Sequence, residues 1–279
     1  MKHLMPMSLV PLSQAPLNEW SGLRFILTDI DDTLTTDGRL SASVYAMIER
    51  LRDFGLAVIP VTGRPAGWCD MIARFWPVDA VVGENGAFYF RYDHERRAMT
   101  RVFSQSIKER AQNRQLLARI REEVLRVVPN AAVATDQGYR EADLAIDFAE
   151  DVNRLPDQDI DKIVAIFEAS GAIAKVSSIH VNGWFGDHDK LSMTKKLLRE
   201  EFGVAAESAE GQDVCTFIGD APNDAPMFRF FRKSVGVANI AAFADRCAVL
   251  PKWITPGEGG EGFCAFAACI LASIEQNTS

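Results

Sequence analysis

The chain has 279 residues, of which 48% are hydrophobic and 24% are charged, so it can bury a substantial core in one large or two modest domains. A formal net charge of −8 and a pI near 5.1 argue against nucleic acid or an anionic membrane as the main partner. The cysteines are odd in number and show no Cys-x-x-Cys spacing, which indicates reduced thiols rather than a metal site: Cys69, Cys215, Cys247, Cys264 and Cys269.

We expect neither a targeting signal nor a membrane segment in residues 1–20 or 262–274. Pro6, Pro11 and Pro16 interrupt residues 1–20, and no apolar stretch there is long enough for a signal peptide, so we expect a flexible leader. Residues 262–274 are apolar but too short to span a bilayer, and they predict a packed terminal helix. These features favour a cytoplasmic protein without a membrane partner.

The first predicted strand is an apolar run that ends in carboxylates, at residues 25–34. Residues two apart on an extended segment point the same way, so Asp29 and Asp31 converge while Ile30 turns into the core. Two carboxylates held that close favour a divalent cation, and Mg²⁺ suits a carboxylate pair that also handles a phosphate. The alternative is a solvated turn in which Asp32 or Thr33 caps the next segment.

Helices and strands alternate after this run. Residues 41–54 carry apolar side chains at helical spacing, with Ser41 as the N-cap, and residues 57–61 predict the second strand. Pro65 opens another helix, and residues 80–82 predict a third strand. This alternation predicts an α/β fold with a doubly wound parallel sheet of the Rossmann-like type, with ligands at the carboxyl ends of the strands.

A change of rhythm at residue 92 predicts an inserted domain. A long amphipathic helix, short β-like segments, a second helix and a strand at residues 174–181 come before the α/β series resumes. We therefore expect an inserted α+β cap domain over residues 92–187, within a catalytic core formed by residues 21–91 and 188–279.

The resumed core carries a second group of charged side chains. Residues 189–202 predict a helix that begins near Lys190. Residues 214–218 predict a buried strand that is followed by Asp220 and Asp224. Two further short strands are predicted at residues 235–237 and 248–250.

Four motifs in this order resemble those of the haloacid dehalogenase-like phosphohydrolases that have a large cap. This group includes Cof-like proteins and the sucrose-, trehalose- and mannosyl-3-phosphoglycerate phosphatases. The motifs are the pair Asp29 and Asp31, the segment Thr62-Gly63-Arg64, Lys190, and the segment from Gly219 to Asp224.

The resemblance implies a role for each motif. Asp29 would be the nucleophile that forms an aspartyl-phosphate, and Asp31 would protonate the leaving oxygen and then activate water. An Asp at the second position favours a phosphatase or mutase over the dehalogenases and ion pumps of the family. Asp220 and Asp224, with Asp29 and the backbone carbonyl of Asp31, would hold Mg²⁺. The implied phosphate-binding residues are Thr62, Gly63, Lys190 and Asn223.

Several of these assignments have a structural alternative. Thr62 also suits the N-cap of the following helix, and Arg64 either reaches the phosphate or substrate or lies exposed near the helix start. Large-cap relatives commonly have Lys followed by Gly, whereas Leu191 follows Lys190 here. Lys195 is therefore a competing choice, and either lysine can be a solvated helix charge.

Substrate choice is expected to lie in the cap, because the core handles only the phosphate. The predicted substrate residues are Arg64, Arg140, Asn182 and Trp184. Asn182 and Trp184 alternate with His180 along a predicted strand, so these side chains can share one face. A face with Trp and amide groups suits a sugar, and packing within the cap is the alternative.

Two turns next to the predicted site have local interpretations. Asp32 stands where relatives with this cap often have Gly, and we expect its side chain to hydrogen-bond within the turn. Glu84 and Asn85 follow the third strand and would border the pocket, although a plain Asn-Gly turn explains Asn85 equally well.

The sequence therefore predicts a Mg²⁺-dependent phosphatase for a small phosphorylated metabolite, with sugar phosphates as the favoured class. The alternative is a phosphomutase of the phosphomannomutase type, which needs a bisphosphate activator and releases no inorganic phosphate. A phosphate-ligand sensor without turnover is disfavoured by the intact pair of Asp29 and Asp31. We expect a monomer or a homodimer.

Overall fold

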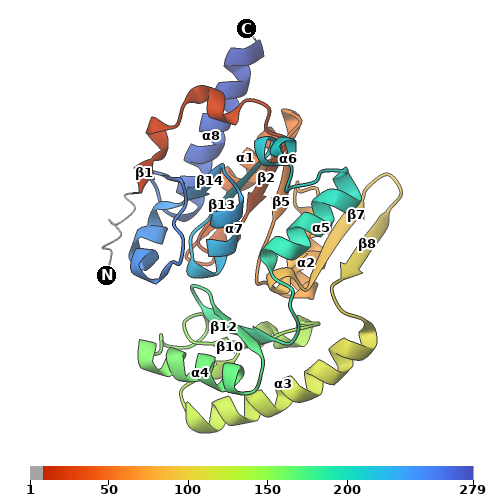
Figure 1. The fold of residues 1–279 in the computed structure, drawn as a ribbon, viewed down its shortest axis with the longest axis vertical. Helices are drawn as coiled ribbons and strands as arrows, with labels where there is room; N and C mark the ends of the chain where they lie inside the picture. Colours follow the sequence, from red (N-terminus) through yellow and green to blue (C-terminus); the bar gives the residue numbers. More distant parts are fainter. Residues whose placement is uncertain (1–8, 279) are drawn as a thin grey trace. The chain divides into compact units, whose positions relative to one another are not determined.

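The computed structural model describes residues 9–278, which divide into two compact units. The first unit contains the residues up to Pro60 and those from Leu198 onward, and the second unit is Val61–Leu197 (Figure 1). None of the helices formed by the described residues combines the length and apolar character that crossing a bilayer requires.

The first unit is built on a six-stranded sheet in which every neighbouring pair is parallel. This sheet confirms the predicted α/β fold, and all four residues of its strand Phe25–Thr28 are buried. In spatial order the strands are β1 (Val10–Pro11), β15 (Trp253–Ile254), β14 (Ser234–Gly236), β13 (Cys215–Gly219), β2 (Phe25–Thr28) and β5 (Ala57–Pro60) (Figure 1).

The first helix of this unit, Ala42–Asp53, begins where the sequence predicts it. The Ser41 hydroxyl accepts a hydrogen bond from the backbone N–H of Val44, as expected of an N-cap. The terminal helix packs against the first helix and covers more residues than predicted. The helices are α1 (Ala42–Asp53), α6 (Ala209–Val214), α7 (Ala225–Phe230) and α8 (Gly259–Thr278), and α5 (Lys190–Phe202) continues from the second unit; β3 (Thr35–Thr36) and β4 (Arg39–Leu40) form a small hairpin.

The expected flexible leader is structured from Val10 onward. Val10 pairs with Trp253 in the parallel sheet, and the fully buried Trp20 lies 5.1 Å from Trp253 and 5.3 Å from Phe266, centroid to centroid. Burying these large aromatic rings offsets the entropy lost when the segment is ordered. The prediction is therefore wrong for residues 10–20, whereas residues 1–8 lie outside the described residues.

The last strand also differs from its prediction. Residues 248–250 are not a strand, and β15 lies at Trp253–Ile254 instead. Pro251 separates the two segments, and a proline has no N–H to donate to a neighbouring strand.

The third predicted strand joins a different sheet. It forms β6 (Val81–Gly83), which pairs antiparallel with β7 (Phe88–Asp93), and β7 pairs antiparallel with β8 (Ala98–Phe103). A single parallel bridge joins Val61 to Val82. The chain reverses between β6 and β7 because Glu84 and Asn85 adopt left-handed φ angles of 42° and 52°.

The predicted cap contains a four-stranded antiparallel sheet in the order β11 (Ile173–Val176), β12 (His180–Trp184), β10 (Leu144–Asp147) and β9 (Ala132–Val133). The single strand predicted at residues 174–181 is thus two strands. The Ser177 hydroxyl accepts the backbone N–H of His180 and stabilises the turn between them.

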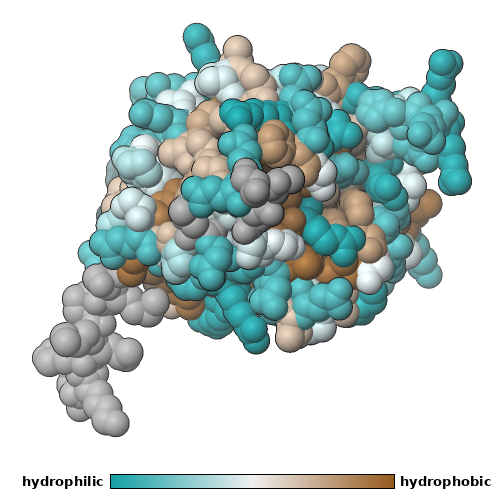
Figure 2. All heavy atoms as spheres, turned by 90° about the horizontal axis from the view of Figure 1, so that it is seen from above, coloured by the Kyte–Doolittle hydropathy of each residue, from teal (hydrophilic) through white to brown (hydrophobic). Residues whose placement is uncertain are grey.

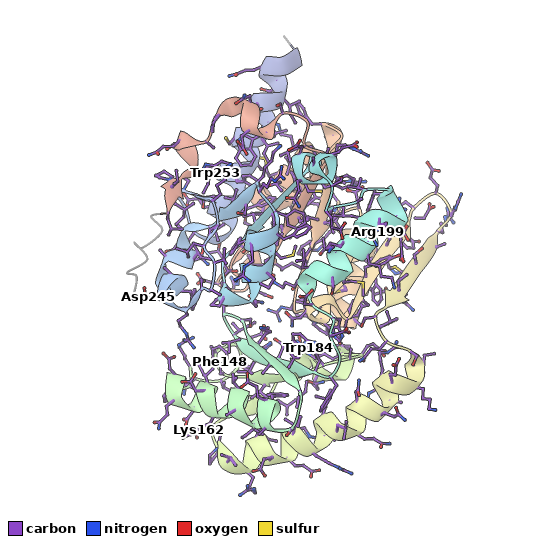
Figure 3. All side chains as sticks on the ribbon, in the orientation of Figure 1. Phe148, Lys162, Trp184, Arg199, Asp245 and Trp253 are labelled. Carbon is purple, nitrogen blue, oxygen red and sulfur yellow. The ribbon has the colours of Figure 1, made fainter. Side chains whose placement is uncertain are left out.

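Two helices share an apolar core with this sheet. They are α3 (Ile107–Val127) and α4 (Asp157–Ala169), and the shared core includes Leu117, Ile120, Ile163 and Phe167. In Figure 3 Phe148 and Trp184 lie inside this unit, and Lys162 points outward from α4. The compact unit is larger than the predicted cap, because it also includes α2 (Ala66–Phe75) and the β6–β7–β8 sheet.

The face of the molecule shown in Figure 2 is mostly polar. Figure 2 shows hydrophilic side chains over most of the face it presents, with smaller hydrophobic patches between them. Scattered apolar residues of this kind are ordinary for a globular protein.

Candidate active site

Three of the predicted aspartates converge in the first unit. Asp29 follows β2 and Asp220 follows β13, and these strands are parallel neighbours, so their carboxyl ends meet. Asp224 ends the short 3₁₀ turn after Asp220. One carboxylate oxygen of each residue lies within 4.8 Å of the others, and the side chains are nearly inaccessible, with exposures of 6%, 1% and 0%.

The loop after β13 holds the carboxylate of Asp224 in place. Its Oδ2 accepts hydrogen bonds from the backbone N–H groups of Asp220 at 3.1 Å and of Ala221 at 3.3 Å. A Cβ on Gly219 would overlap this same oxygen, so only glycine fits at that position. The Gly-Asp sequence thus has a steric reason.

Two residues that the sequence interpretation missed orient Asp220. The Thr33 hydroxyl donates to Asp220 Oδ1 at 3.1 Å. Asn239 Nδ2 donates to the carbonyl of Asp32 at 2.9 Å and lies 3.5 Å from Asp220 Oδ2. Thr33 belongs to the first motif and could have been chosen for its hydroxyl, whereas no local pattern marks Asn239.

The turn after β2 explains the position of Asp32. The Ile30 carbonyl accepts the N–H groups of Leu34 at 2.9 Å and Thr35 at 3.0 Å, and the turn needs a left-handed residue, with φ at 56° for Asp32. Asp32 also donates its N–H to the Thr35 hydroxyl. Gly and Asp both tolerate this conformation. Asp31 is partly exposed and its side chain is not one of the three converging carboxylates.

The three carboxylates fit a divalent cation. Each contributes a hard oxygen ligand, and a bound cation reduces the repulsion between carboxylates held this close in a buried site. Asn223 lies beside them in sequence, and within the described residues its buried Oδ1 has no hydrogen-bond partner. The chemistry of the donor set therefore supports a metal-binding site.

The predicted phosphate residues Thr62 and Gly63 belong to the second unit. The Thr62 hydroxyl accepts the backbone N–H of Arg64 at 3.0 Å, whereas the N-cap of α2 is Pro65. The alternative role of Thr62 as the helix N-cap is therefore wrong. Its carbonyl accepts the N–H of Asn85, which ties this loop to the turn at Glu84–Gly86.

Lys190 is buried at the first residue of α5, with an exposure of 3%. Asp189 Oδ1 accepts the N–H of Ser192 at 2.7 Å and thereby caps this helix. Gly86 packs so closely on the Asp189 carbonyl that a Cβ would overlap it. Because Lys190 is buried, the solvated-charge alternative does not apply to it, whereas Lys195 is partly exposed.

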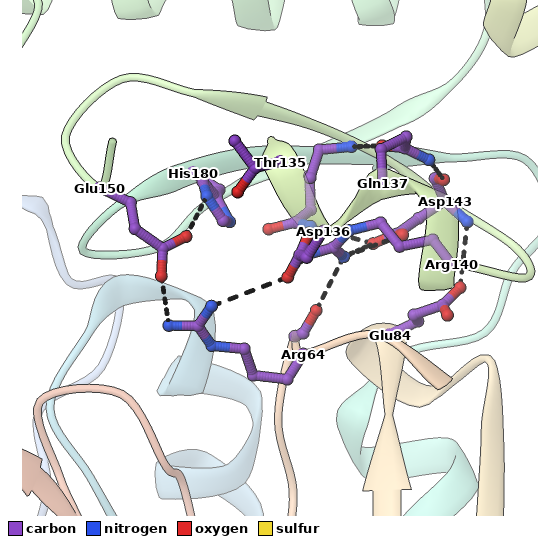
Figure 4. Close-up of polar contacts among 12 residues, drawn as sticks. Arg64, Glu84, Thr135, Asp136, Gln137, Arg140, Asp143, Glu150 and His180 are labelled. Atoms are coloured by element: carbon purple, nitrogen blue, oxygen red, sulfur yellow. Dashed lines mark hydrogen bonds and ion pairs between the residues drawn. The ribbon is translucent and has the colours of Figure 1, made fainter. Parts of the chain in front are cut away.

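Arg140 is a predicted substrate residue whose guanidinium group is fully buried in a charged network (Figure 4). Its Nη1 donates to the Gly63 carbonyl at 3.0 Å and to Asp143 at 3.0 Å, and its Nε donates to Asp136 at 3.1 Å. Burial opposes the charge, but Asp143 and Asp136 outweigh it and hold the pKa of Arg140 above its usual value. The N–H groups of Arg140 that make these contacts bind other residues of the protein.

Glu84 belongs to the same network and accepts hydrogen bonds from backbone N–H groups. Its carboxylate receives the backbone N–H groups of Ala66 at 3.0 Å and of Glu141 and Ala142 at 2.9 and 2.6 Å. Burial, with the charge of Asp143, raises the pKa of Glu84 to about 8 against the opposing effects of Arg140 and the N–H donors. Glu84 therefore binds the first N–H of α2 and joins this helix to the segment around Glu141.

Arg64 lies in a second part of the network, where Glu150 binds it and His180 (Figure 4). The Arg64–Glu150 distance is 2.7 Å, the His180–Glu150 distance is 2.9 Å, and Arg64 lies 3.7 Å from Asp136. Because Arg64 has an exposure of 4%, the alternative of an exposed Arg64 is wrong. Desolvation raises the pKa of Glu150, but the hydrogen bonds from His180 and Arg64 outweigh it and lower the pKa to about 2.

This arrangement predicts an acid-dependent loss of stability. The native pKa of Glu150 lies below its ordinary value of 4.5, so its stabilisation is complete above that pH and is lost as the pH falls toward about 2. We expect the Glu150→Gln variant to show a smaller fall in unfolding free energy over this window, measured by urea denaturation. The exposed Glu168→Gln on α4 is the matched control, and an unchanged pH slope in Glu150→Gln would contradict the expectation.

The two remaining predicted substrate residues are Asn182 and Trp184. Asn182 is buried, donates to Asp143 Oδ2 at 2.9 Å, and places Oδ1 3.7 Å from where a Cβ on Gly63 would lie. Trp184 donates to the His188 carbonyl and stacks on its ring, which favours the packing alternative for Trp184. Burial lowers the pKa of His188 to about 4, so its ring is neutral near pH 7.

The parallel sheet identifies a Rossmann-like α/β protein. The three buried aspartates at the carboxyl ends of its adjacent strands form an oxygen-rich ligand site. The chain belongs to the haloacid dehalogenase-like hydrolase family, whose model matches residues 26–168. No match was found among curated protein sequences.

Solved structures with the same fold extend over nearly the whole chain. A protein from Thermoplasma acidophilum is 20% identical with a TM-score of 0.67, over 89% of this chain and 98% of that one. A putative HAD/COF-like hydrolase from Plasmodium vivax is 17% identical with a TM-score of 0.65, over 93% and 100%. The sucrose-phosphatase of Synechocystis sp. PCC6803, solved with sucrose and phosphate, is 13% identical with a TM-score of 0.60, over 90% and 97%.

Proposed function

We propose that this protein is a Mg²⁺-dependent phosphatase that hydrolyses a small phosphorylated metabolite, with sugar phosphates as the favoured class. The observation that carries the proposal is the convergence of Asp29, Asp220 and Asp224 within 4.8 Å in a buried site. Such a site binds a cation with oxygen ligands, and phosphoryl transfer requires charge cancellation of this kind.

Asp29 is the proposed nucleophile, and its attack on the phosphorus atom gives an aspartyl-phosphate and releases the alcohol. Asp31 donates a proton to the leaving oxygen and then accepts one from the water that cleaves the intermediate. Mg²⁺, when bound by Asp29, Asp220, Asp224 and the carbonyl of Asp31, supplies positive charge that neutralises the phosphoryl oxygens. The partial exposure of Asp31 is compatible with proton exchange.

Thr62, Gly63, Lys190 and Asn223 are the proposed phosphate-binding residues. Lys190 is preferred over Lys195 because it is buried at the start of α5, beside the Glu84–Gly86 turn, whereas Lys195 is partly exposed. The contacts of the Glu84–Gly86 turn with Thr62 and with Asp189 support this set, because they fix the backbone on both sides. The cap residues are expected to select the organic part of the substrate.

Asn182 is the best supported of the proposed substrate residues. Arg64, Arg140 and Trp184 each use polar atoms in ion pairs or hydrogen bonds within the second unit. Asn182 also donates one N–H to Asp143, but it is a buried amide close to Gly63, and an amide has a second N–H and a carbonyl oxygen that can bind sugar hydroxyls. The sucrose and phosphate bound to the Synechocystis neighbour support a sugar phosphate as the substrate class.

The test is a measurement of inorganic phosphate released from a panel of sugar phosphates, polyol phosphates, nucleotides and phosphorylated cofactors. We expect release from at least one sugar phosphate with Mg²⁺ and none with a chelator. If phosphate is not released, but a sugar 1-phosphate is converted to its 6-phosphate with a bisphosphate activator, the phosphomutase alternative holds. Binding of phosphorylated ligands without either reaction would identify the sensor.

A further inference from the structure

The second unit contains a cavity of about 450 Å³ between α3 and the segment that leads into β10. This volume is in the range of small-molecule sites. None of the proposed phosphate-binding residues Thr62, Gly63 and Lys190 lines it. The buried side chains of Leu117 and Leu144 contribute apolar surface to the wall.

Three arginines on one face of α3 give this cavity its charge. Arg110, Arg114 and Arg121 recur at helical spacing and all line it. The wall also contains Arg140 and Asp143, which pair with each other and cancel. Glu141 is the remaining acid, so three cationic groups face one carboxylate in a chain whose net charge is −8.

Glu141 is a weak partner for these arginines. Its Oε2 lies 3.9 Å from Arg110 Nε and 3.6 Å from Arg114 Nη2, both too long for a hydrogen bond. Among the ion pairs of residues 9–278, Arg121 has no acidic partner within 4.0 Å. The site therefore has unused donors for an anion.

Contacts with the protein hold Arg110 in position, and among the described residues one of its N–H donors has no acceptor. Its side chain is only 11% exposed, its Nη1 donates to the Gln105 carbonyl at 2.9 Å, and its guanidinium lies 3.7 Å from the Phe103 ring centroid. The buried Nε has no hydrogen-bond partner within the described residues. A buried guanidinium N–H without an acceptor is costly, which points to a ligand that supplies one.

We propose that this cavity binds a small organic polyanion, with at least two phosphate or carboxylate groups. One anionic group accepts from Arg110 and Arg114 in place of the Glu141 carboxylate, and a second one pairs with Arg121. The apolar wall formed by Leu117 and Leu144 contacts the carbon skeleton. None of the residues proposed to bind phosphate lines this cavity, and its existence does not depend on the phosphatase activity.

The test uses isothermal titration calorimetry on chelator-treated, metal-free protein, with citrate as the carboxylate probe and fructose 1,6-bisphosphate as the phosphate probe. We expect saturable binding of at least one probe, and the probe that binds identifies the acidic group preferred. The Arg114→Gln/Arg121→Gln double variant should raise Kd at least about tenfold, because each arginine contributes a charge-assisted hydrogen bond. Both arginines are exposed, so the fold should tolerate the change.

Two further variants separate this site from other causes. Glu141→Gln removes the competing carboxylate and should lower Kd several-fold. Arg119→Gln is the matched control, because Arg119 is an exposed arginine of the same helix that does not line the cavity, and it should leave Kd unchanged. If neither probe binds, or if binding is the same in the double variant, the proposal is wrong.

Discussion

The Asp29→Asn variant is expected to lose turnover by about four orders of magnitude or more, because an amide cannot replace a carboxylate as the nucleophile. The fold should persist. The backbone N–H of Asp29 bonds to the Ile218 carbonyl at 2.9 Å, and this contact does not involve the side chain. Removing one of three converging carboxylates also relieves repulsion in the metal-free protein. Phosphate release and urea denaturation measure the two effects.

Asp53→Asn is the control for Asp29→Asn, because it makes the same substitution at an exposed position at the end of α1 in the same unit. It should leave both turnover and stability unchanged. Turnover of Asp29→Asn within about a hundredfold of the wild type, at saturating Mg²⁺, would argue against a nucleophilic role. A loss of turnover that accompanies unfolding would leave the nucleophile to be tested with a folded variant such as Asp29→Glu, which must also be inactive because the longer side chain displaces the attacking oxygen.

The sequence was sufficient for features that depend on local periodicity. The buried run at Phe25–Thr28 and the Ser41 cap follow from strand period and helix capping, and the family resemblance placed Asp220 with Asp29. Each of these rules operates over a few residues or over one known sheet geometry. Such features remain predictable whatever the rest of the chain does.

Features that depend on long-range packing were not predicted. Pairing of Val10 with Trp253 joins residues at opposite ends of the chain, and nothing near Val10 marks it. The acceptors of Arg140 and the two partners of Glu150 likewise come from separate segments. From sequence alone, a single charged residue is interpreted as solvated until its partners are known. For this reason Arg64 had an exposed alternative, and Glu150 was not considered.

The Asp220→Asn variant is expected to separate metal binding from chemistry. Changing a residue that merely orients a ligand costs about 10- to 100-fold in metal affinity, so loss of a direct carboxylate ligand should raise the Kd for Mg²⁺ by about 100-fold or more. The asparagine keeps an oxygen that can accept from the Thr33 hydroxyl, which now bonds Asp220 Oδ1 at 3.1 Å. Metal-free stability should therefore be equal to or higher than that of the wild type.

The dependence of turnover on Mg²⁺ concentration distinguishes Asp220→Asn from Asp29→Asn. If Asp220 acts through the metal, high Mg²⁺ should restore part of the turnover in Asp220→Asn, whereas Asp29→Asn stays inactive because its defect lies in the nucleophile. Calorimetric titration with Mg²⁺ measures the metal affinity, and thermal unfolding with and without the metal measures the stability. Asp213→Asn, at an exposed position of α6, should change neither. An unchanged Mg²⁺ affinity in Asp220→Asn would remove this carboxylate from the metal site and leave the buried cluster without its proposed purpose.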